Sequence, residues 1–240
     1  MGPCAALLAL LFALAAAPRP TAPVQQQVFD SGTFTLFLND ARIGEERFVI
    51  REERAGTAGP IYRAGAELNL KLDGRTMRVS AALETVGARC RPRRYELQVN
   101  GPEVTSITGR LVRERMRLDI RSPRGDEMKE FLVRGQAAIL ERHIAHLYFF
   151  ASKVLGNAAS SELVLIVPQH RLQQQATMEN RGMEIVRIGE RELQLRHLAI
   201  TSDTRTVHHI WLDGDRVMRV EVPEEGFLAV RSDITDQAVR

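Results

Sequence analysis

Residues 66–86 read AELNLKLDGRTMRVSAALETV, and this stretch decides the fold class. Apolar and polar side chains alternate over residues 66–72, which is typical of a β-strand with one buried face. Asp73-Gly74 is a favoured two-residue connection between antiparallel strands, and residues 76–86 continue as the returning strand. The stretch therefore predicts a β-hairpin.

The same pattern recurs in both directions from this hairpin. Short alternating segments are separated by Gly, Pro, Asn or Asp at intervals of about 8 to 12 residues, the spacing of an antiparallel meander. No linker divides the chain, so residues 33–236 are expected to form a single β-rich domain. The predicted fold class is mainly β, a curved antiparallel meander sheet that forms a half-barrel or open barrel.

One segment departs from the β pattern. Residues 136–155, QAAILERHIAHLYFFASKVL, contain no Gly or Pro and are followed by Gly156-Asn157, a helix stop signal. Their apolar residues recur at helical spacing and extend well around the cylinder. We expect one apolar helix at about 136–155, covered by the sheet.

The N-terminus resembles an export signal. Residues 5–17, AALLALLFALAAA, are apolar and end in small side chains, but they are too short to cross a bilayer core of roughly 30 Å. No Lys or Arg precedes them, which departs from the usual signal pattern. We expect residues 1–22 to be a cleaved signal peptide and residues 23–32 a flexible lead-in. The mature protein is then periplasmic or secreted, without a stable transmembrane anchor.

Composition limits the partners and the chemistry. The net charge is only +3 from 33 basic and 30 acidic residues, and 5% of residues are aromatic, so a basic surface with stacking aromatics for nucleic acid is not expected. Signal cleavage would leave Cys90 as the only cysteine, which excludes an intrachain disulfide. Cys90 is flanked by arginines that would activate a thiol, or it is a small buried side chain at a strand end.

Residues 208–222, HHIWLDGDRVMRVEV, raise the question of a histidine–aspartate site. A two-residue loop at Gly214-Asp215 places His209, Trp211 and Met218 on one apolar face and pairs His208 with Glu221 across the strands. His208 and His209 then point to opposite faces and cannot bind one metal ion together. The interpretation is a structural hairpin.

The remaining candidate motifs are weak. Glu141, His143 and His146 lie close together, but the histidines are three residues apart and lack the zinc-protease pattern. No serine nucleophile elbow or phosphate-binding loop occurs. Glu45 and Glu46 are adjacent and would point to opposite faces of a strand. No metal, no cofactor and no catalytic residue is predicted, and an enzymatic role would rest on the histidines alone.

Two stretches carry a resemblance. Residues 34–50, FTLFLNDARIGEERFVI, resemble the opening hairpin of a group of exported bacterial proteins of unknown function, and residues 208–231, HHIWLDGDRVMRVEVPEEGFLAVR, resemble their closing pattern. Such proteins are similar in plan to the LolA-like half-barrels, in which a curved sheet wraps helices and can hold acyl chains. The resemblance implies an apolar cavity beneath the helix. LolA-like carriers usually have more than one helix, whereas this chain offers one.

The expected function is non-catalytic, the binding or carriage of a hydrophobic small molecule or lipid in the cell envelope. The predicted ligand-binding residues come from the helix and the hairpin: Leu140, Ile144, Leu147, Phe150, His209, Trp211 and Met218. The alternative is a structural or protein-interaction module with a filled core and an exposed edge strand or apolar patch.

Overall fold

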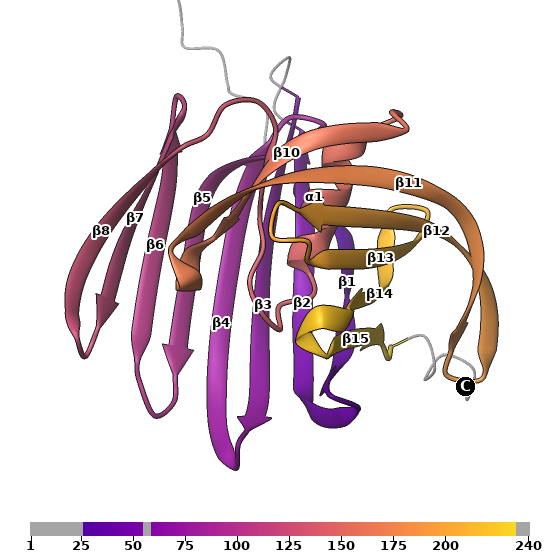
Figure 1. The fold of residues 1–240 in the computed structure, drawn as a ribbon, viewed down its shortest axis with the longest axis horizontal. Helices are drawn as coiled ribbons and strands as arrows, with labels where there is room; N and C mark the ends of the chain where they lie inside the picture. The colour runs from indigo at the N-terminus through magenta and orange to yellow at the C-terminus, as the bar shows by residue number, and fades with distance from the viewer. Residues whose placement is uncertain (1–25, 55–58, 234–240) are drawn as a thin grey trace, which may run out of the picture.

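The computed structural model describes residues 26–54 and 59–233, and its strands form one sheet of fifteen strands (Figure 1). The first eight strands are a meander: β1 (Gln26–Leu38), β2 (Ala41–Arg54), β3 (Pro60–Leu72), β4 (Arg75–Val86), β5 (Arg91–Asn100), β6 (Thr105–Val112), β7 (Arg115–Ser122) and β8 (Gly125–Leu132). The second group is β9 (Ala137–Ile139), β10 (Ser160–Val167), β11 (Leu172–Ile188), β12 (Arg191–Ser202), β13 (Val207–Asp213), β14 (Arg216–Val222) and β15 (Phe227–Arg231). Two short 3-10 helices, η2 (Pro168–His170) and η3 (Pro223–Glu225), precede β11 and β15. The mainly β, curved meander that the sequence predicts is confirmed.

The two meanders are joined through the first and last strands. β1 pairs antiparallel with β15, so the order runs from β8 through β1 and β15 to β9. Arg231 strengthens this junction because its Nη1 and Nη2 each donate to an Asp30 carboxylate oxygen at 2.9 Å in a buried, bidentate pair. Among the described strands, β9 and β10 form the only parallel pair.

The sheet curves until its two ends approach each other. The hairpin β10–β11 arches over the interior of the molecule (Figure 1). We call the place where β8 faces the β10–β11 turn the open seam. Here Arg171 Nε donates to Glu127 Oε2 of β8 at 2.6 Å, and Gln173 Nε2 donates to the carbonyl of Leu132 at 2.9 Å. Side-chain contacts, and not a ladder of backbone hydrogen bonds, therefore bridge β8 to the β10–β11 turn in an open barrel.

One helix, α1 (Leu147–Leu155), lies inside the curve. All of its side chains except Lys153 are buried, as the apolar sequence requires. Phe149 packs on Phe29 and Tyr62 with ring centroids 5.2 and 5.6 Å apart. Lys153 lies over two of these rings and reaches Asp215 at 2.7 Å.

The predicted helix bounds of 136–155 are wrong at the N-terminal end. Residues 137–139 form β9 instead, because they gain backbone partners on β10. His143 then adopts φ 63°, a left-handed conformation that a helix cannot contain. The backbone N–H groups of Ala145 and His146 donate to the buried carboxylate of Glu46 at 2.5 and 2.9 Å, which fixes where α1 begins.

The domain boundaries need one correction. β1 begins at Gln26 and pairs with β2 along its length, so residues 26–32 of the expected flexible lead-in belong to the sheet. The expected signal peptide at 1–22 lies outside the described residues. Among the described residues no helix is long and apolar enough to cross a membrane.

Candidate functional site

Three turns of the second meander meet the segment before α1 and enclose a cavity of about 210 Å³, which we call the end cavity. These turns are β10–β11, β12–β13 and β14–β15. The apolar part of the wall is Leu140, Leu165, Val167, Leu172 and Phe227. The polar part is Glu141, Arg142, His143, Tyr148, His170, Gln174, Thr206, His208 and Glu225. A larger hollow of about 660 Å³ lies over β2–β6, but it is more open, and its lining mixes solvent-facing residues with buried ones such as Phe48, Leu97 and Ile107.

Glu141 is the most constrained polar group of the end cavity. Its side chain is only 3% exposed, and its Oε1 accepts from the Tyr95 hydroxyl at 3.1 Å and from the Gln169 backbone N–H at 2.9 Å. Its Oε2 is buried and has no hydrogen-bond partner. Burial raises the pKa of Glu141 to about 8, against the lowering effect of the two hydrogen bonds. At neutral pH the carboxyl group is therefore mostly protonated, and its Oε2 atom lacks a hydrogen-bond partner.

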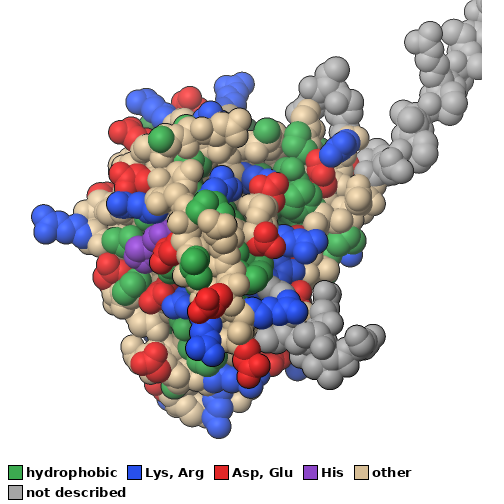
Figure 2. Space-filling model, turned by 90° about the vertical axis from the view of Figure 1, so that its right-hand side faces the viewer, with side chains coloured by type: hydrophobic (Ala, Val, Ile, Leu, Met, Phe, Trp, Pro, Cys, Tyr) green, Lys and Arg blue, Asp and Glu red, His purple; other side chains and the backbone are tan. Residues whose placement is uncertain are grey.

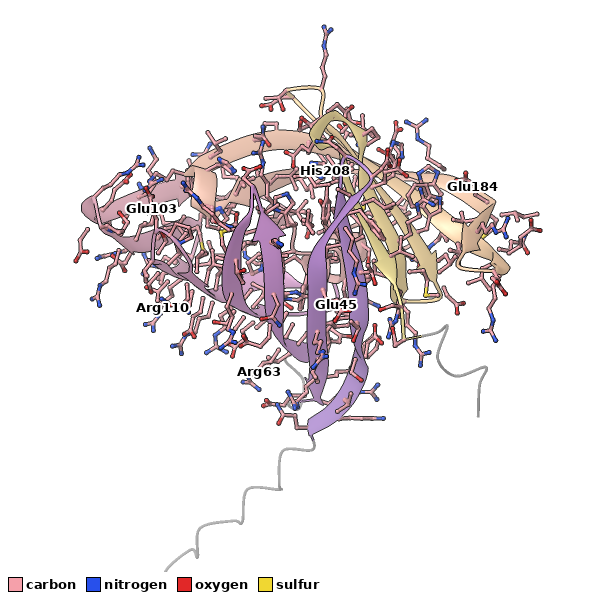
Figure 3. The ribbon with its side chains drawn as sticks, turned by 90° about the horizontal axis from the view of Figure 1, so that it is seen from below. Glu45, Arg63, Glu103, Arg110, Glu184 and His208 are labelled. Carbon is pink, nitrogen blue, oxygen red and sulfur yellow. The ribbon has the colours of Figure 1, made fainter. Side chains whose placement is uncertain are left out.

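Tyr148 and His208 form a second polar pair in this wall. The Tyr148 hydroxyl and His208 Nδ1 share a hydrogen bond of 2.9 Å, which links α1 to β13. Burial lowers the pKa of His208 to about 4 and raises the pKa of Tyr148. Both groups are consequently uncharged at neutral pH. Figure 3 shows His208 between the two halves of the sheet.

The rim of the end cavity carries two more histidines and one ion pair. Burial lowers the pKa of His143 to about 4, and its ring lies 5.4 Å from that of Phe227. Burial also lowers the pKa of His170. Arg142 and Glu225 pair across the rim at 3.4 Å. The only formal charges on the wall therefore form a pair, and the rest of the lining is neutral.

The hairpin β13–β14 differs from the predicted register. Asp213 pairs with Arg216 and Leu212 with Val217 as expected, but a β-bulge follows, and Trp211 lies opposite Arg219 instead of Met218. The expected His208–Glu221 pair is wrong, since His209 is the residue opposite Glu221. The bulge adds one residue to β14, a device that sequence alternation does not reveal.

The structure divides the predicted ligand-binding residues among three places. Leu140 lines the end cavity. Ile144, Leu147 and Phe150 are packed in the main core, away from its wall. His209, Trp211 and Met218 lie on the outer face of the sheet, where Trp211 and Met218 join a small separate cluster with Val186, Ile188 and Leu195. As predicted, His209 and Trp211 share one face of the sheet, and His208 points to the other face. The prediction that the helix and hairpin residues line one common site is wrong.

The histidines near α1 do not form a metal site. His143 lines the end cavity, whereas His146 is sealed in the core with its Nδ1 2.5 Å from Glu46 Oε1. Across the described ranges, no group of three or more His, Cys, Asp or Glu side chains is placed to hold a metal ion. Burial raises the pKa of Cys90 to about 12, so the arginines beside it in sequence do not activate its thiol.

Sequence reasoning missed most of the end cavity. In the sequence, Glu141 and His143 suggest a metal-binding or catalytic role and not a cavity wall, while Tyr148 and His170 carry no signal beyond residue type. These side chains come from segments that the turns bring together, and no local spacing encodes that meeting.

No family model matches this chain, and no curated protein is significantly similar to it. Among solved structures, it is similar to the crystal structure of a beta-barrel-like protein of domain of unknown function DUF1849 from Brucella abortus. The sequence identity is 10% and the TM-score is 0.49, with 87% of this chain and 95% of that chain covered. At this identity the similarity concerns the fold alone.

Proposed function

We propose that this protein is a non-catalytic binding protein of the cell envelope, and that its ligand is a compact, uncharged molecule with both apolar and polar groups, held in the end cavity. The observation that carries the proposal is the wall of that cavity. Apolar side chains from the segment before α1, β10, β11 and β15 stand among nine polar side chains that are mostly neutral, a mixed lining that fits a small uncharged molecule.

The size of the end cavity favours a compact ligand over a long acyl chain. Its volume of about 210 Å³ lies below the range of about 300–1,000 Å³ that is usual for drug-sized ligands. The space beneath the arch is filled by α1, whose Phe149 and Phe150 are almost completely buried. A lipid chain would have to displace these side chains, at a cost of several kcal/mol for each buried aromatic lost.

The polar groups indicate what the ligand presents. Most polar side chains of the wall, among them Gln174 and Thr206, are neutral groups that donate and accept hydrogen bonds. A carbonyl, ether or hydroxyl oxygen on the ligand would suit them. A carboxylate or ammonium group is disfavoured because the nearby histidines are neutral and Arg142 is already paired with Glu225.

Export is part of the same proposal, and residues 5–17 support it. Its test is the intact mass of the protein recovered from the periplasmic fraction. A chain that begins near residue 23 is expected, and a full-length chain in the cytosol would exclude the envelope location.

The binding proposal is tested by saturation-transfer NMR with a panel of uncharged fragments small enough for the end cavity. We expect Val167→Phe, which fills the cavity from β10, to abolish the signal of fragments that bind the wild type. Val112→Phe is the matched control because Val112 is exposed on β6. The proposal fails if the panel gives no binder, or if Val167→Phe and the control bind the same fragments equally well.

One observation favours the alternative, a protein-interaction module. Met183 and Ile185 lie on the same side of β11 and are 58% and 71% exposed. The strand extends here beyond its pairing with β10, which ends at Glu179, so the apolar pair is near an unpaired edge. Met183→Ser/Ile185→Ser is expected to remove association with an envelope partner in a pull-down while leaving fragment binding intact; unchanged association would exclude this surface.

A further inference from the structure

His197 and His209 meet on the outer face of the sheet, away from the end cavity. His197 of β12 lies opposite Trp211 of β13, and Ala199 lies opposite His209, so the two histidines are diagonal neighbours on adjacent strands. His197 Nε2 and His209 Nδ1 are 2.9 Å apart. Histidine surface is visible on the side of the molecule shown in Figure 2.

Glu184 of β11 fixes the orientation and tautomer of His197. Its Oε2 lies 3.0 Å from His197 Nδ1 and accepts the Trp211 indole N–H at 2.9 Å. The Nδ1 proton of His197 is therefore directed to the carboxylate, and Nε2 keeps its lone pair. A carboxylate that holds the outer nitrogen of a histidine is the usual support of a metal-binding imidazole. Figure 3 shows Glu184 at the outer end of this half of the sheet.

We propose that His197 Nε2 and His209 Nδ1 form a binding site for a divalent transition metal ion, with Cu²⁺ as the preferred ion. The 2.9 Å between the two nitrogens is the length of their hydrogen bond, and it brings both nitrogens within reach of one ion once the rings rotate to turn their lone pairs toward it. Imidazole nitrogens suit Cu²⁺, which is the tightest-binding divalent ion of the first-row series.

Metal binding replaces a hydrogen bond within the pair. In the free protein a single proton, on His209 Nδ1, joins the two nitrogens. When the ion binds, His209 carries its proton on Nε2 instead, and both lone pairs face the ion. No proton is lost from the protein in this exchange, because each ring stays neutral.

The site has two protein ligands, consistent with the lack of any group of three or more ligating side chains in the described ranges. Water completes the coordination, so the ion is exchangeable. The neighbouring cations are already paired: Arg219 of β14 lies over Trp211 and is held by Glu221 at 2.7 Å, and Arg181 is held by Glu179 at 2.6 Å. Their repulsion of the ion is reduced accordingly.

Trp211 makes the proposal measurable, since it is the only tryptophan of the chain and stacks on both rings at 4.7 and 5.7 Å. Titration with CuCl₂ is expected to quench its fluorescence with one saturable 1:1 transition. His197→Gln or His209→Gln should raise the Kd by at least about tenfold. Asn100→Gln is the control, because Asn100 is exposed at the end of β5 in the other half of the sheet, and it should leave the Kd unchanged.

Pulsed EPR of the wild-type Cu²⁺ complex gives a second measurement that needs no variant. Two equatorial imidazole nitrogens are expected. Fewer than two, or the same Kd in the wild type and in a folded His197→Gln/His209→Gln variant, would overturn the proposal.

Discussion

Glu141 ties the stability of the fold to pH through one buried carboxyl group. In the folded chain it keeps its proton up to a pKa of about 8, whereas the ordinary value is 4.5. Folding therefore retains a proton between these values, and the contribution of Glu141 to stability decreases by about 1.4 kcal/mol per pH unit as the pH rises through that window. Below pH 4.5 this contribution is complete, and above pH 8 it is lost.

Glu141→Gln should remove this dependence, because the amide reproduces the neutral carboxyl group and can still accept from Tyr95. We expect the free energy of unfolding of the variant, measured in urea, to gain a few kcal/mol relative to the wild type between pH 5 and pH 8.5. Other titrating groups are common to both proteins and cancel. A difference between the two proteins that is the same at both pH values would show that Glu141 does not titrate in this window.

Single residues also show which structural features can be predicted from the sequence and which cannot. Alternation alone placed His208 and His209 on opposite faces, because the strand period of two is a local property. The contacts of these histidines were not predictable in the same way. Tyr148 lies 60 residues before His208 and on a different element, and Glu184 reaches His197 from the adjacent strand β11. Such partners depend on the register and curvature of the whole sheet.

At the scale of elements, α1 depends on a carboxylate from β2. Glu46 is completely buried and accepts from the backbone N–H groups of Ala145 and His146, which a short helix leaves unsatisfied at its N-terminus. Glu46→Ala is expected to destabilise the protein by about 2–4 kcal/mol in chemical denaturation, since these buried donors lose their acceptor.

Glu45→Ala is the matched control for that substitution. Glu45 is the adjacent residue, its side chain is 38% exposed, and its partner Arg42 is exposed as well. An exposed pair of this kind contributes at most about 1 kcal/mol. Equal losses of stability in the two variants would contradict the assigned role of Glu46. The contrast follows from strand alternation, which predicted that the two carboxylates face opposite sides.

The helix itself shows where periodicity stops being informative. Residues 136–155 are apolar at helical spacing, and the burial of the segment follows from that composition. Its first part nevertheless forms β9 and an irregular segment, because the edge of β10 and the carboxylate of Glu46 offer backbone partners from distant parts of the chain. A short apolar run fits a buried strand and a buried helix equally well, and only tertiary contacts decide between them.

For the whole molecule, the open seam predicts a gradient of stability across the sheet. β2 is paired on both sides, by β1 and β3, whereas β8 is paired only with β7 and exposes nearly all of its side chains. Amide hydrogens of β8 should therefore exchange much faster than those of β2 in hydrogen-exchange mass spectrometry.

The Arg171–Glu127 pair, which joins β8 to the β10–β11 turn, tests the same gradient. Its side chains are 40% and 46% exposed, so Arg171→Ala should lower the local stability of residues 125–132 by no more than about 1 kcal/mol. Arg54→Ala, at an exposed position far from the seam, should leave β8 exchange unchanged. If β8 were as protected as β2, or if Arg171→Ala unfolded the whole sheet, the two ends would be joined as a closed barrel and not by a few side chains.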